Sequence, residues 1–284
     1  MKGGGDVLLN VKEFLKPTSV EQAFEMLNRD RKHSILLSGG TTVSLMKSTT
    51  VEVIIDLKNI KELAEIKETE DGLSVGANIT IEDFRKSDLI STFFGNFFSK
   101  SFATVGSWQI RNMATIGGSV APRLGWSDVT TCLLAAGAKL KTFGEEGYRY
   151  MDIEDFNKLD RYSKPIITHV ILPKDGYLYS FKKLSKSSFD IAIVNFALAL
   201  KLNSGIVESS RVVIGSRPHF PKRFEKVEEA LKGLKIEEVP EHVKPLVFEH
   251  FEGGSNFLAT EEYRRHMASV LAERAAKEIR EMIA

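Results

Sequence analysis

The chain has 284 residues and a formal net charge of +1 at pH 7. That length suits two domains, and the near-neutral charge argues against nucleic acid as the main partner, because phosphate binding needs a clustered basic surface. The sequence contains no apolar run of membrane-spanning length and no signal-peptide core, so we expect a cytoplasmic protein.

The cysteine and histidine content argues against a metal or iron–sulfur centre. Cys132 is the single cysteine, whereas a cluster takes about four thiolates, so we expect it to be a buried residue on a helix. The histidines lack ligand spacing such as HExxH, and no metal site is predicted. Nucleophile elbow, Walker A and Rossmann motifs are also missing. We therefore predict no catalytic side chain, and chemistry that resides in a bound cofactor.

The first elements along the chain form a small βαβ-like unit. Thr18 and Glu21 make a capping-box pattern ahead of an apolar helical face. A short buried strand at 34–37 then runs into the glycine turn 38–42 and a short helix. A second strand follows at 53–56.

The middle of the chain changes from helical to strand-like sequence. A helix opens at 80–83, and the phenylalanines at 93, 94, 97 and 98 are expected to pack in a core. Three strands are predicted next, at Lys139–Phe143, Tyr148–Tyr150 and Ile166–Leu172. The turn-forming residues Pro173–Gly176 indicate a linker.

The last third of the chain predicts an α+β domain with helices on one face of an antiparallel sheet. Its expected strands are 177–183, 191–202 and 206–215. Its expected helices are 221–231, 238–250 and 261–282.

The segment 103–119 is the most informative part of the sequence, because it holds glycine turns at Gly106 and Gly117-Gly118. Glycine lets backbone N–H groups approach a phosphate or a flavin edge that a Cβ atom would block. Farther on, Asp128 is read either as a helix cap or as a ligand. Lys182 and Lys183 are read as a solvated strand edge.

The two glycine segments 37–41 and 115–119 resemble the FAD-contacting segments of one protein family. This is the flavoprotein subunit of the xanthine dehydrogenase/carbon monoxide dehydrogenase family of molybdenum hydroxylases. Further matches are Pro17–Ala23, Val53–Leu57, Gln109–Asn112, Ser127–Asp128, Phe189–Ala192 and Glu262–Arg265.

The resemblance implies an α+β fold with a two-lobed PCMH-type (vanillyl-alcohol-oxidase-like) FAD-binding domain. This domain would cover 1–173, with lobes of about 1–57 and 58–173. A small α+β C-terminal domain, a three-stranded antiparallel sheet with three helices, would cover 174–284.

The resemblance also implies which residues contact FAD. The pyrophosphate would be wrapped by Leu36, Leu37, Ser38, Gly39, Gly40, Thr41, Thr42 and Val43 on one side, and held by Thr115, Gly118 and Ser119 on the other. Ser127 and Asp128 would reach the ribityl chain or the adenosine, and Val105 and Gly106 would lie near the isoalloxazine or adenine edge. Ile167 would pack on the flavin, and Lys182 would approach it from the C-terminal domain.

Three features depart from the family pattern. Ser119 stands where many relatives have Asn, the loop 122–126 is unusual, and Lys186 and Ser187 replace a common pair of arginines. The loop bears on cofactor or partner contacts, and the replaced arginines bear on acceptor binding.

The function implied by the resemblance is that of an electron-transfer flavoprotein subunit. It would take electrons from a 2Fe–2S small subunit through noncovalent FAD and pass them to NAD⁺ or another acceptor. A molybdenum-cofactor large subunit would oxidise the substrate, in a heterotrimer or its dimer. Two alternatives stay open: a standalone FAD-dependent oxidoreductase of the same fold, in which Thr41 stands where some members tether flavin through histidine, and a flavin-free scaffold subunit.

Overall fold

The computed structural model describes residues 10–46, 48–70, 72–160, 162–216 and 218–283, so residues 1–9 of the predicted first domain lie outside it. The chain divides into two compact units. Unit 1 is Met1–Phe84, Trp108–Pro122 and Lys139–Ile171. Unit 2 is Arg85–Ser107, Arg123–Ala138 and Leu172–Ala284. The domain boundary after residue 173 stays a prediction.

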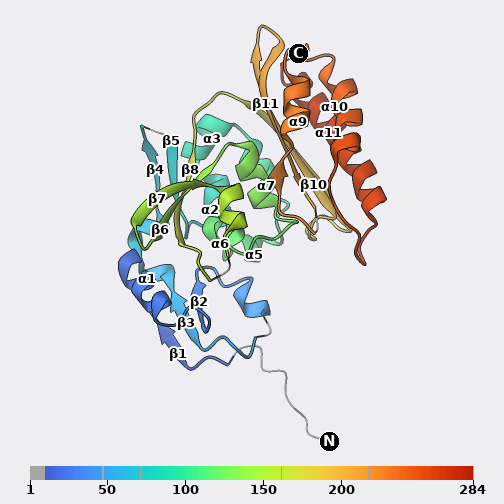
Figure 1. Ribbon diagram of the computed structural model, residues 1–284. Coiled ribbons are helices and arrows are strands. Elements are labelled where there is room, and N and C mark those ends of the chain that lie inside the picture. The colour runs from blue at the N-terminus through green and yellow to red at the C-terminus, as the bar shows by residue number, and fades with distance from the viewer. Residues whose placement is uncertain (1–9, 47, 71, 161, 217, 284) are drawn as a thin grey trace, which may run out of the picture. The chain divides into compact units, whose positions relative to one another are not determined.

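Unit 1 begins with a three-stranded parallel sheet in the order β1-β3-β2 (Figure 1). Its strands are β1 (Glu13–Leu15), β2 (Ser34–Leu37) and β3 (Val53–Asp56). The prediction of β2 and β3 is confirmed, although β2 is only half-buried, and β1 was not predicted. The predicted short helix between them is a 3₁₀ turn, η1 (Val43–Leu45).

Helix α1 (Val20–Arg29) packs on this sheet through Val20, Ala23, Phe24 and Leu27. Its cap lies one residue later than the sequence pattern suggested. The hydroxyl of Ser19 accepts the Gln22 N–H, and the Gln22 side chain accepts the Thr18 N–H. The capping box is therefore built by Ser19 and Gln22, because Ser19 has the extended backbone that an N-cap requires.

The second sheet of unit 1 has five strands in the order β4-β5-β8-β6-β7. They are β4 (Ile66–Thr69), β5 (Gly72–Gly76), β6 (Lys139–Gly144), β7 (Gly147–Asp152) and β8 (Ile166–Leu172). The predicted strands β6, β7 and β8 are confirmed. The antiparallel pair β4 and β5 was not predicted, since β4 is mostly exposed and polar and β5 is short with glycine at both ends.

Short helical segments complete unit 1. They are η2 (Leu57–Asn59), η3 (Lys61–Ala64), α2 (Ile81–Lys86, whose last two residues belong to unit 2), α5 (Trp108–Arg111), α6 (Ile116–Val120) and α8 (Ile153–Lys158). Thr80 caps α2 by accepting the Asp83 N–H, as the sequence predicts. A buried ion pair joins α5 to α2, with Arg111 Nε 2.9 Å from Glu82 Oε2 and side chains 10% and 3% exposed.

Unit 2 contains α3 (Asp88–Phe94), α4 (Phe97–Phe102) and α7 (Asp128–Ala135). Phe94, Phe97 and Phe98 are buried and pack edge-to-face or tilted against one another, which confirms the predicted aromatic core. Phe93 is only half-buried and lies under the Lys174 ammonium. Cys132 is a buried thiol on α7, as expected.

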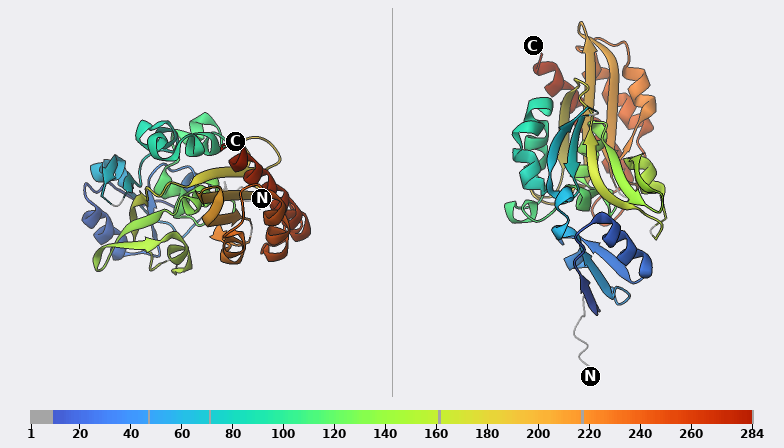
Figure 2. Two further views of the ribbon diagram at one scale, coloured as in Figure 1. Left: turned by 90° about the horizontal axis from the view of Figure 1, so that it is seen from above. Right: turned by 90° about the vertical axis from the view of Figure 1, so that its left-hand side faces the viewer.

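The C-terminal part of unit 2 is an antiparallel sheet covered on one face by the C-terminal helices (Figure 2), while α7 packs on its other face. Its strands are β9 (Leu178–Leu184), β10 (Val194–Asn203), β11 (Ile206–Gly215) and β12 (Lys222–Arg223). Its helices are α9 (Glu225–Leu231), α10 (Val239–His250) and α11 (Glu261–Glu281). All three predicted strands and all three predicted helices are present.

Two predicted boundaries in this region were wrong. Residues 222–223 pair with β11 as the short fourth strand, so α9 begins four residues after Pro221. Strand β10 begins at Val194, and the carbonyl of Ile193 just before it accepts a hydrogen bond from the buried guanidinium of Arg264.

Within the described ranges, no helix combines the length and the apolar character needed to cross a membrane.

Arg264 should be a main determinant of the stability of unit 2. It is 1% exposed, and its guanidinium donates to the Ile193 carbonyl at 2.5 Å and to Asn256 Oδ1 at 2.6 Å. We expect Arg264→Met to lower the free energy of unfolding by about 3 kcal/mol, because it leaves buried acceptors without donors. Denaturant unfolding of both variants checks this. Arg265→Met is the matched control, because that neighbour makes a partly exposed ion pair with Glu261 and lies over the exposed Phe248 ring; equal losses would contradict the prediction.

Candidate functional site

The two glycine segments predicted to act together do meet, within unit 1. The turn after β2 packs directly on the backbone ahead of α6, and a Cβ atom at Gly39 would overlap the carbonyl oxygen of Met113. Gly40 follows with φ of +76°, a conformation that favours glycine. Both glycines of this turn are therefore required by geometry, one for close approach and one for its left-handed backbone.

Side-chain hydrogen bonds lock this junction. Thr115 Oγ1 lies 3.0 Å from Ser38 Oγ, and Ser38 Oγ donates to Asn78 Oδ1 at 2.5 Å. Asn78 Nδ2 in turn donates to the Leu57 carbonyl at 2.8 Å. Since Ser38 Oγ gives its proton to Asn78, the Thr115 hydroxyl donates to Ser38. Thr115 Oγ1 also accepts the Gly118 N–H, so the polar atoms form one continuous chain.

The turn itself presents a run of unused amide donors. None of the backbone N–H groups from Gly39 to Val43 donates a hydrogen bond within the described part of the chain. The carbonyls are used: Gly40 O accepts the Ser44 N–H at 2.8 Å, and Thr42 O accepts the Leu45 N–H at 3.2 Å. A half-buried turn whose donors are unused and whose acceptors are paired attracts an anion.

The amides of the second glycine segment are already bonded. Ile116 N donates to the Ile79 carbonyl, Gly117 N to the Ala77 carbonyl and Gly118 N to Thr115 Oγ1. A Cβ at Gly117 would lie 2.6 Å from the Cβ of Ala77, so this glycine allows α6 to pack closely. Helix α6 is therefore packed closely on the 77–79 segment. The backbone just before it, at Met113, is what the first glycine turn rests on.

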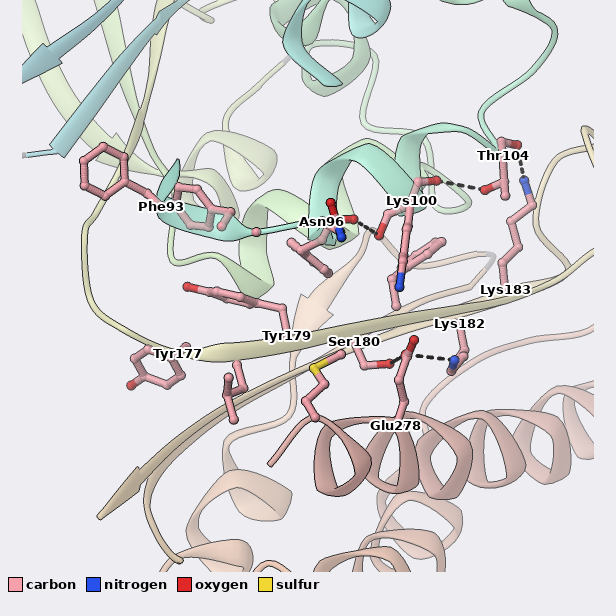
Figure 3. A pocket seen from close by; sticks show the side chains of 17 residues that line it. Phe93, Asn96, Lys100, Thr104, Tyr177, Tyr179, Ser180, Lys182, Lys183 and Glu278 are labelled. Atoms are coloured by element: carbon pink, nitrogen blue, oxygen red, sulfur yellow. Dashed lines mark hydrogen bonds and ion pairs between the residues drawn. The ribbon is translucent and has the colours of Figure 1, made fainter. Parts of the chain in front are cut away.

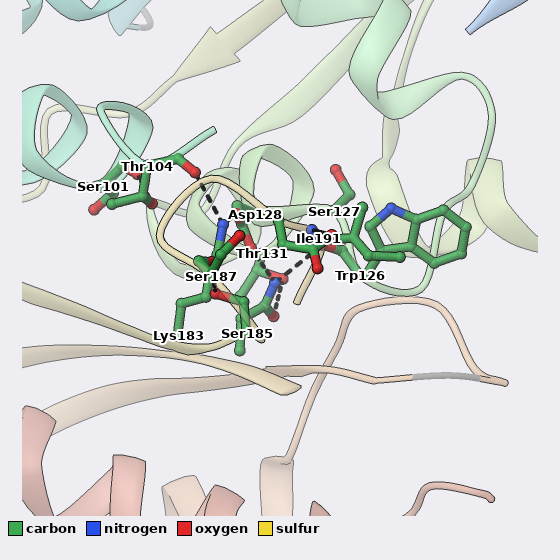
Figure 4. Close-up of polar contacts among 12 residues, drawn as sticks. Ser101, Thr104, Trp126, Ser127, Asp128, Thr131, Lys183, Ser185, Ser187 and Ile191 are labelled. Carbon is green, nitrogen blue, oxygen red and sulfur yellow. Dashed lines mark hydrogen bonds and ion pairs between the residues drawn. The ribbon is translucent and has the colours of Figure 1, made fainter. Parts of the chain in front are cut away.

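In unit 2 a buried polar cluster surrounds the N-terminus of α7 (Figure 4). Lys183 Nζ lies 2.9 Å from Asp128 Oδ2, and their side chains are 7% and 6% exposed. Asn195 Nδ2 donates to Asp128 Oδ1 at 2.7 Å, and Thr131 Oγ1 donates to Asn195 Oδ1 at 2.8 Å. The cap of α7 is Ser127, whose hydroxyl accepts the Thr130 N–H, so Asp128 is not the cap.

Burial governs the ionisation of this cluster. It raises the pKa of Asp128 above its ordinary value, while the Lys183 ammonium and the Asn195 amide lower it. Burial also raises the pKa of the Cys132 thiol well above its ordinary value, and the Asp128 charge adds to that shift. Cys132 is therefore an unreactive structural thiol.

The expectation of a solvated edge at Lys182 and Lys183 was wrong. Successive residues of a strand point to opposite faces, so the two lysines enter different surroundings. Lys183 is buried against Asp128. Lys182 is partly buried on the other face, with Nζ 2.9 Å from Glu278 of α11.

Lys182 and Glu278 line a pocket of about 620 Å³ along the β9 edge (Figure 3). Glu278 accepts from both Ser180 and Lys182 there. On the other face of β9 the lining is aromatic, with Phe97 and Tyr179 stacked at 4.9 Å between ring centres. Tyr179 is held by a 2.9 Å hydrogen bond from its hydroxyl to Asp175.

The predicted contact residues divide between the units. Unit 1 contains Leu36, Leu37, Ser38, Gly39, Gly40, Thr41, Thr42, Val43, Thr115, Gly118, Ser119 and Ile167. Unit 2 contains Val105, Gly106, Ser127, Asp128 and Lys182. Of the first set, Ser38 and Thr115 are in direct contact, and Ile167 is a buried residue of β8. Contact of these residues with a cofactor stays a prediction.

Sequence reasoning missed four residues that shape these sites: Asn78, Met113, Lys183 and Asn195. Asn78 stands two residues before the predicted helix start at Thr80–Asp83. Asn195 is an isolated polar residue near the start of the apolar strand 194–200. An asparagine inside an apolar strand signals a buried partner.

Within the described ranges, no group of three or more His, Cys, Asp or Glu side chains is arranged to hold a metal ion.

The sequence matches two protein families along most of its length. Residues 9–175 match the family described as the FAD binding domain in molybdopterin dehydrogenase. Residues 179–279 match the CO dehydrogenase flavoprotein C-terminal domain.

Similar proteins of known name come from several microorganisms. The glyceraldehyde dehydrogenase medium chain of Sulfolobus acidocaldarius is 26% identical over 274 residues, which cover 94% of this chain and 97% of that protein. The nicotinate dehydrogenase FAD-subunit of Eubacterium barkeri is 27% identical, over 79% of this chain and 80% of its own.

The fold is that of a solved dehydrogenase chain. A chain in the crystal structure of the cyanide-inactivated Cu,Mo-CO dehydrogenase superposes with a TM-score of 0.88 at 22% identity. The superposition covers 97% of this chain and 99% of that chain. It confirms the predicted architecture, a two-lobed α+β FAD-binding domain followed by a small α+β domain.

The close approach at Gly39 should make even one methyl group costly. We expect Gly39→Ala to lower the free energy of unfolding by about 2 kcal/mol or more, because the Met113 backbone cannot move away cheaply. Gly144→Ala is the matched control in unit 1, since a Cβ there would lie an ordinary 3.5 Å from Pro165. Chemical denaturation measures both. Equal stability of the two variants would show that the contact imposes no constraint.

Proposed function

Because the chain belongs to the family of FAD-binding domains in molybdopterin dehydrogenases, we propose that it relays electrons in a molybdenum hydroxylase. It is an FAD-binding oxidoreductase subunit of this family. In the proposal it receives electrons from a 2Fe–2S small subunit and passes them to NAD⁺ or another acceptor. A molybdenum-cofactor large subunit would oxidise the substrate, and the assembly would be a heterotrimer or its dimer in the cytoplasm.

The observation that carries the cofactor site is the run of amides from Gly39 to Val43 that have no acceptor among the residues the structure describes. A pyrophosphate is a dianion rich in acceptor oxygens, and consecutive backbone N–H groups are the donors that bind such a group. Glycine at 39 lets this turn rest on the Met113 backbone, and glycine at 40 gives it the left-handed bend, so the turn keeps the shape that presents its amides. The residues present therefore fit the diphosphate of FAD.

The roles of the chain's own residues follow from that fit. The amides of Gly39–Val43 would hold the diphosphate, while Ser38, Asn78 and Thr115 keep the turn in place through their hydrogen bonds. When bound, FAD supplies the redox chemistry, which is intrinsic to the flavin ring. The protein's task is to bind and orient the cofactor and to control access to it, which agrees with the predicted lack of catalytic side chains.

Exposed apolar side chains near the glycine segments support a role inside a complex. Trp108 is 58% exposed, and Ile110, Met113 and Leu45 are exposed as well. Large apolar side chains left in water commonly mark a protein–protein interface. The names of the relatives support the same idea, since two of them are called a medium chain and an FAD-subunit.

The FAD prediction is tested by Gly118→Leu. Its Cβ would lie 2.7 Å from Thr115 Oγ1, and no backbone atom stands in its way, so the fold should survive while the Thr115 hydroxyl is displaced from the junction with Ser38 and a larger side chain stands on α6. We expect the purified wild type to carry or take up stoichiometric FAD and this variant to retain little. Visible absorbance and thermal unfolding measure binding and folding separately.

Several outcomes of this test distinguish the competing functions. A wild type that stays colourless after incubation with FAD would support the scaffold alternative. Anaerobic bleaching of the loaded protein by NADH would support NAD⁺ as the acceptor. Bleaching by an organic substrate, with no other subunit present, would support the standalone oxidoreductase.

The proposed complex is tested at Trp108. We expect Trp108→Ala to weaken association with the co-expressed 2Fe–2S and molybdenum subunits by about 2 kcal/mol, as for a central interface aromatic. Tyr150→Ala, at a 59% exposed aromatic on β7, is the control. Co-purification yields and sedimentation measure assembly. Failure of the wild type to assemble, or equal assembly of both variants, would contradict this interface.

A further inference from the structure

Strand β9 (Leu178–Leu184) is an edge strand of the C-terminal sheet, and it differs from other edges of the fold. Among the described strands it pairs with β10 alone. The edge strands β4 and β7 of unit 1 expose most of their residues, whereas every residue of β9 is at least partly buried. Because unpaired edges are templates for further strands, a sheltered edge without a partner strand calls for an explanation.

The free edge of β9 carries backbone groups that lack partners. Pairing with one neighbour uses the N–H and C=O groups on one side of a strand and leaves those on the other side unpaired. Apart from the bonds to β10 and to the residue before it, no backbone group of 178–184 makes a hydrogen bond within the part of the chain that the structure describes. Partly buried backbone groups of this kind favour the binding of another backbone.

The cavity of about 620 Å³ described above runs along this edge, and all its lining residues belong to unit 2. We call it the β9 groove. It is bounded by β9 itself, by side chains of the segment 93–104 and by the end of α11. Its volume is within the range of about 300–1,000 Å³ that is typical of ligand pockets.

The β9 groove has an apolar end and a cationic end. Phe93 and Tyr177 lie at one end, and Lys100 and Lys182 lie at the other (Figure 3). Lys182 is paired with Glu278, whereas the Lys100 side chain makes no hydrogen bond or ion pair with any residue that the structure describes. The Lys100 ammonium is therefore available to a carboxylate that an incoming ligand supplies.

We propose that the β9 groove binds an extended, acidic segment of another protein, which adds to the edge of β9 as a further strand. The backbone of this segment pairs with the unbonded groups of β9. An apolar side chain lies against the aromatic end, and an acidic side chain meets Lys100. In this mode of recognition the main-chain bonds give affinity and the side-chain pockets give specificity. The inference goes beyond the proposed function and does not depend on FAD.

Charge distinguishes this occupant from a second copy of the chain. The residues of β9 include two lysines and no Asp or Glu, so edge-to-edge pairing of two β9 strands would bring more ammonium groups and no carboxylate for Lys100. A small amphipathic anion would match the two ends of the groove but would leave most of the β9 backbone unbonded. An acidic peptide strand satisfies the edge, the aromatic end and Lys100 together.

The test uses the full chain and a fluorescently labelled, capped peptide, Glu-Thr-Val-Phe-Val-Thr-Glu. Its sequence reads the same in both directions, so it serves parallel and antiparallel addition alike. One control peptide has lysine at both ends, and another is N-methylated at its interior residues and so lacks their backbone donors. Fluorescence anisotropy measures binding, and hydrogen exchange over 178–184 reports on the β9 edge.

The protein variants are Lys100→Glu and, as the matched control, Lys232→Glu. Lys232 is an exposed lysine of the same unit that lies outside the groove. Both side chains are exposed, so thermal unfolding should show that both variants fold.

We expect the wild type to bind the glutamate peptide with a Kd below about 1 mM and to show slower hydrogen exchange in β9 when the peptide is bound. Lys100→Glu should weaken binding about tenfold, because it replaces attraction by repulsion, and lysine at the peptide ends should do the same. N-methylation should weaken it at least as much, since the strand pairing is lost. Lys232→Glu should bind as the wild type does.

The inference is overturned if the wild type does not bind the glutamate peptide at about 1 mM, or if Lys100→Glu or the N-methylated peptide binds equally well. Displacement of the peptide by decanoate, with no slowing of exchange in β9, would instead assign the groove to a small amphipathic anion. A wild-type dimer that the peptide dissociates would assign it to a second copy. FAD binding is measured separately, so none of these results decides the proposed function.

Discussion

The contact between Gly39 and the Met113 backbone is the constraint on which the unit 1 site depends. It brings together two segments that are distant in the sequence, and it exists only because residue 39 has no side chain. Once the turn rests on that backbone, Ser38 reaches Thr115 and Asn78, and the orientation of the following amides is fixed. The site for an anion is thus a product of close backbone packing, with side chains serving to hold it.

The two glycine segments have different tasks, although they look alike in sequence. Within the described residues the amides of 39–43 donate no hydrogen bond, whereas those of 116–118 are bonded to the 77–79 segment and to Thr115. Anion binding needs donors that are both oriented and unused. The geometry therefore favours the first segment as the direct ligand and the second as its support. Glycine allows close backbone packing in both cases, at Gly39 against Met113 and at Gly117 against Ala77.

The sequence was informative where local rules decide the structure. Glycine turns, the strands β2, β3 and β6–β11, and the aromatic core were predicted because periodicity and turn chemistry are local. The surroundings of Lys182 and Lys183 were not, since they depend on strand register and on which helix covers each face. Strand β4 was missed for a related reason. Its polar sequence shows no buried face, and it is a strand only because β5 lies beside it.

Buried ion pairs next to glycine-rich segments follow from the same physics. A segment rich in glycine offers few side chains for packing, so hydrophobic contact alone cannot fix its backbone. Arg111 with Glu82 lies just ahead of the turn before α6, and Lys183 with Asp128 holds the turn after α4. Such pairs are poor sources of net stability, because the desolvation of two charges offsets most of their attraction. The presence of these pairs is better explained by the directionality of their hydrogen bonds. A charged hydrogen bond fixes a backbone group at one distance, where apolar packing would allow several.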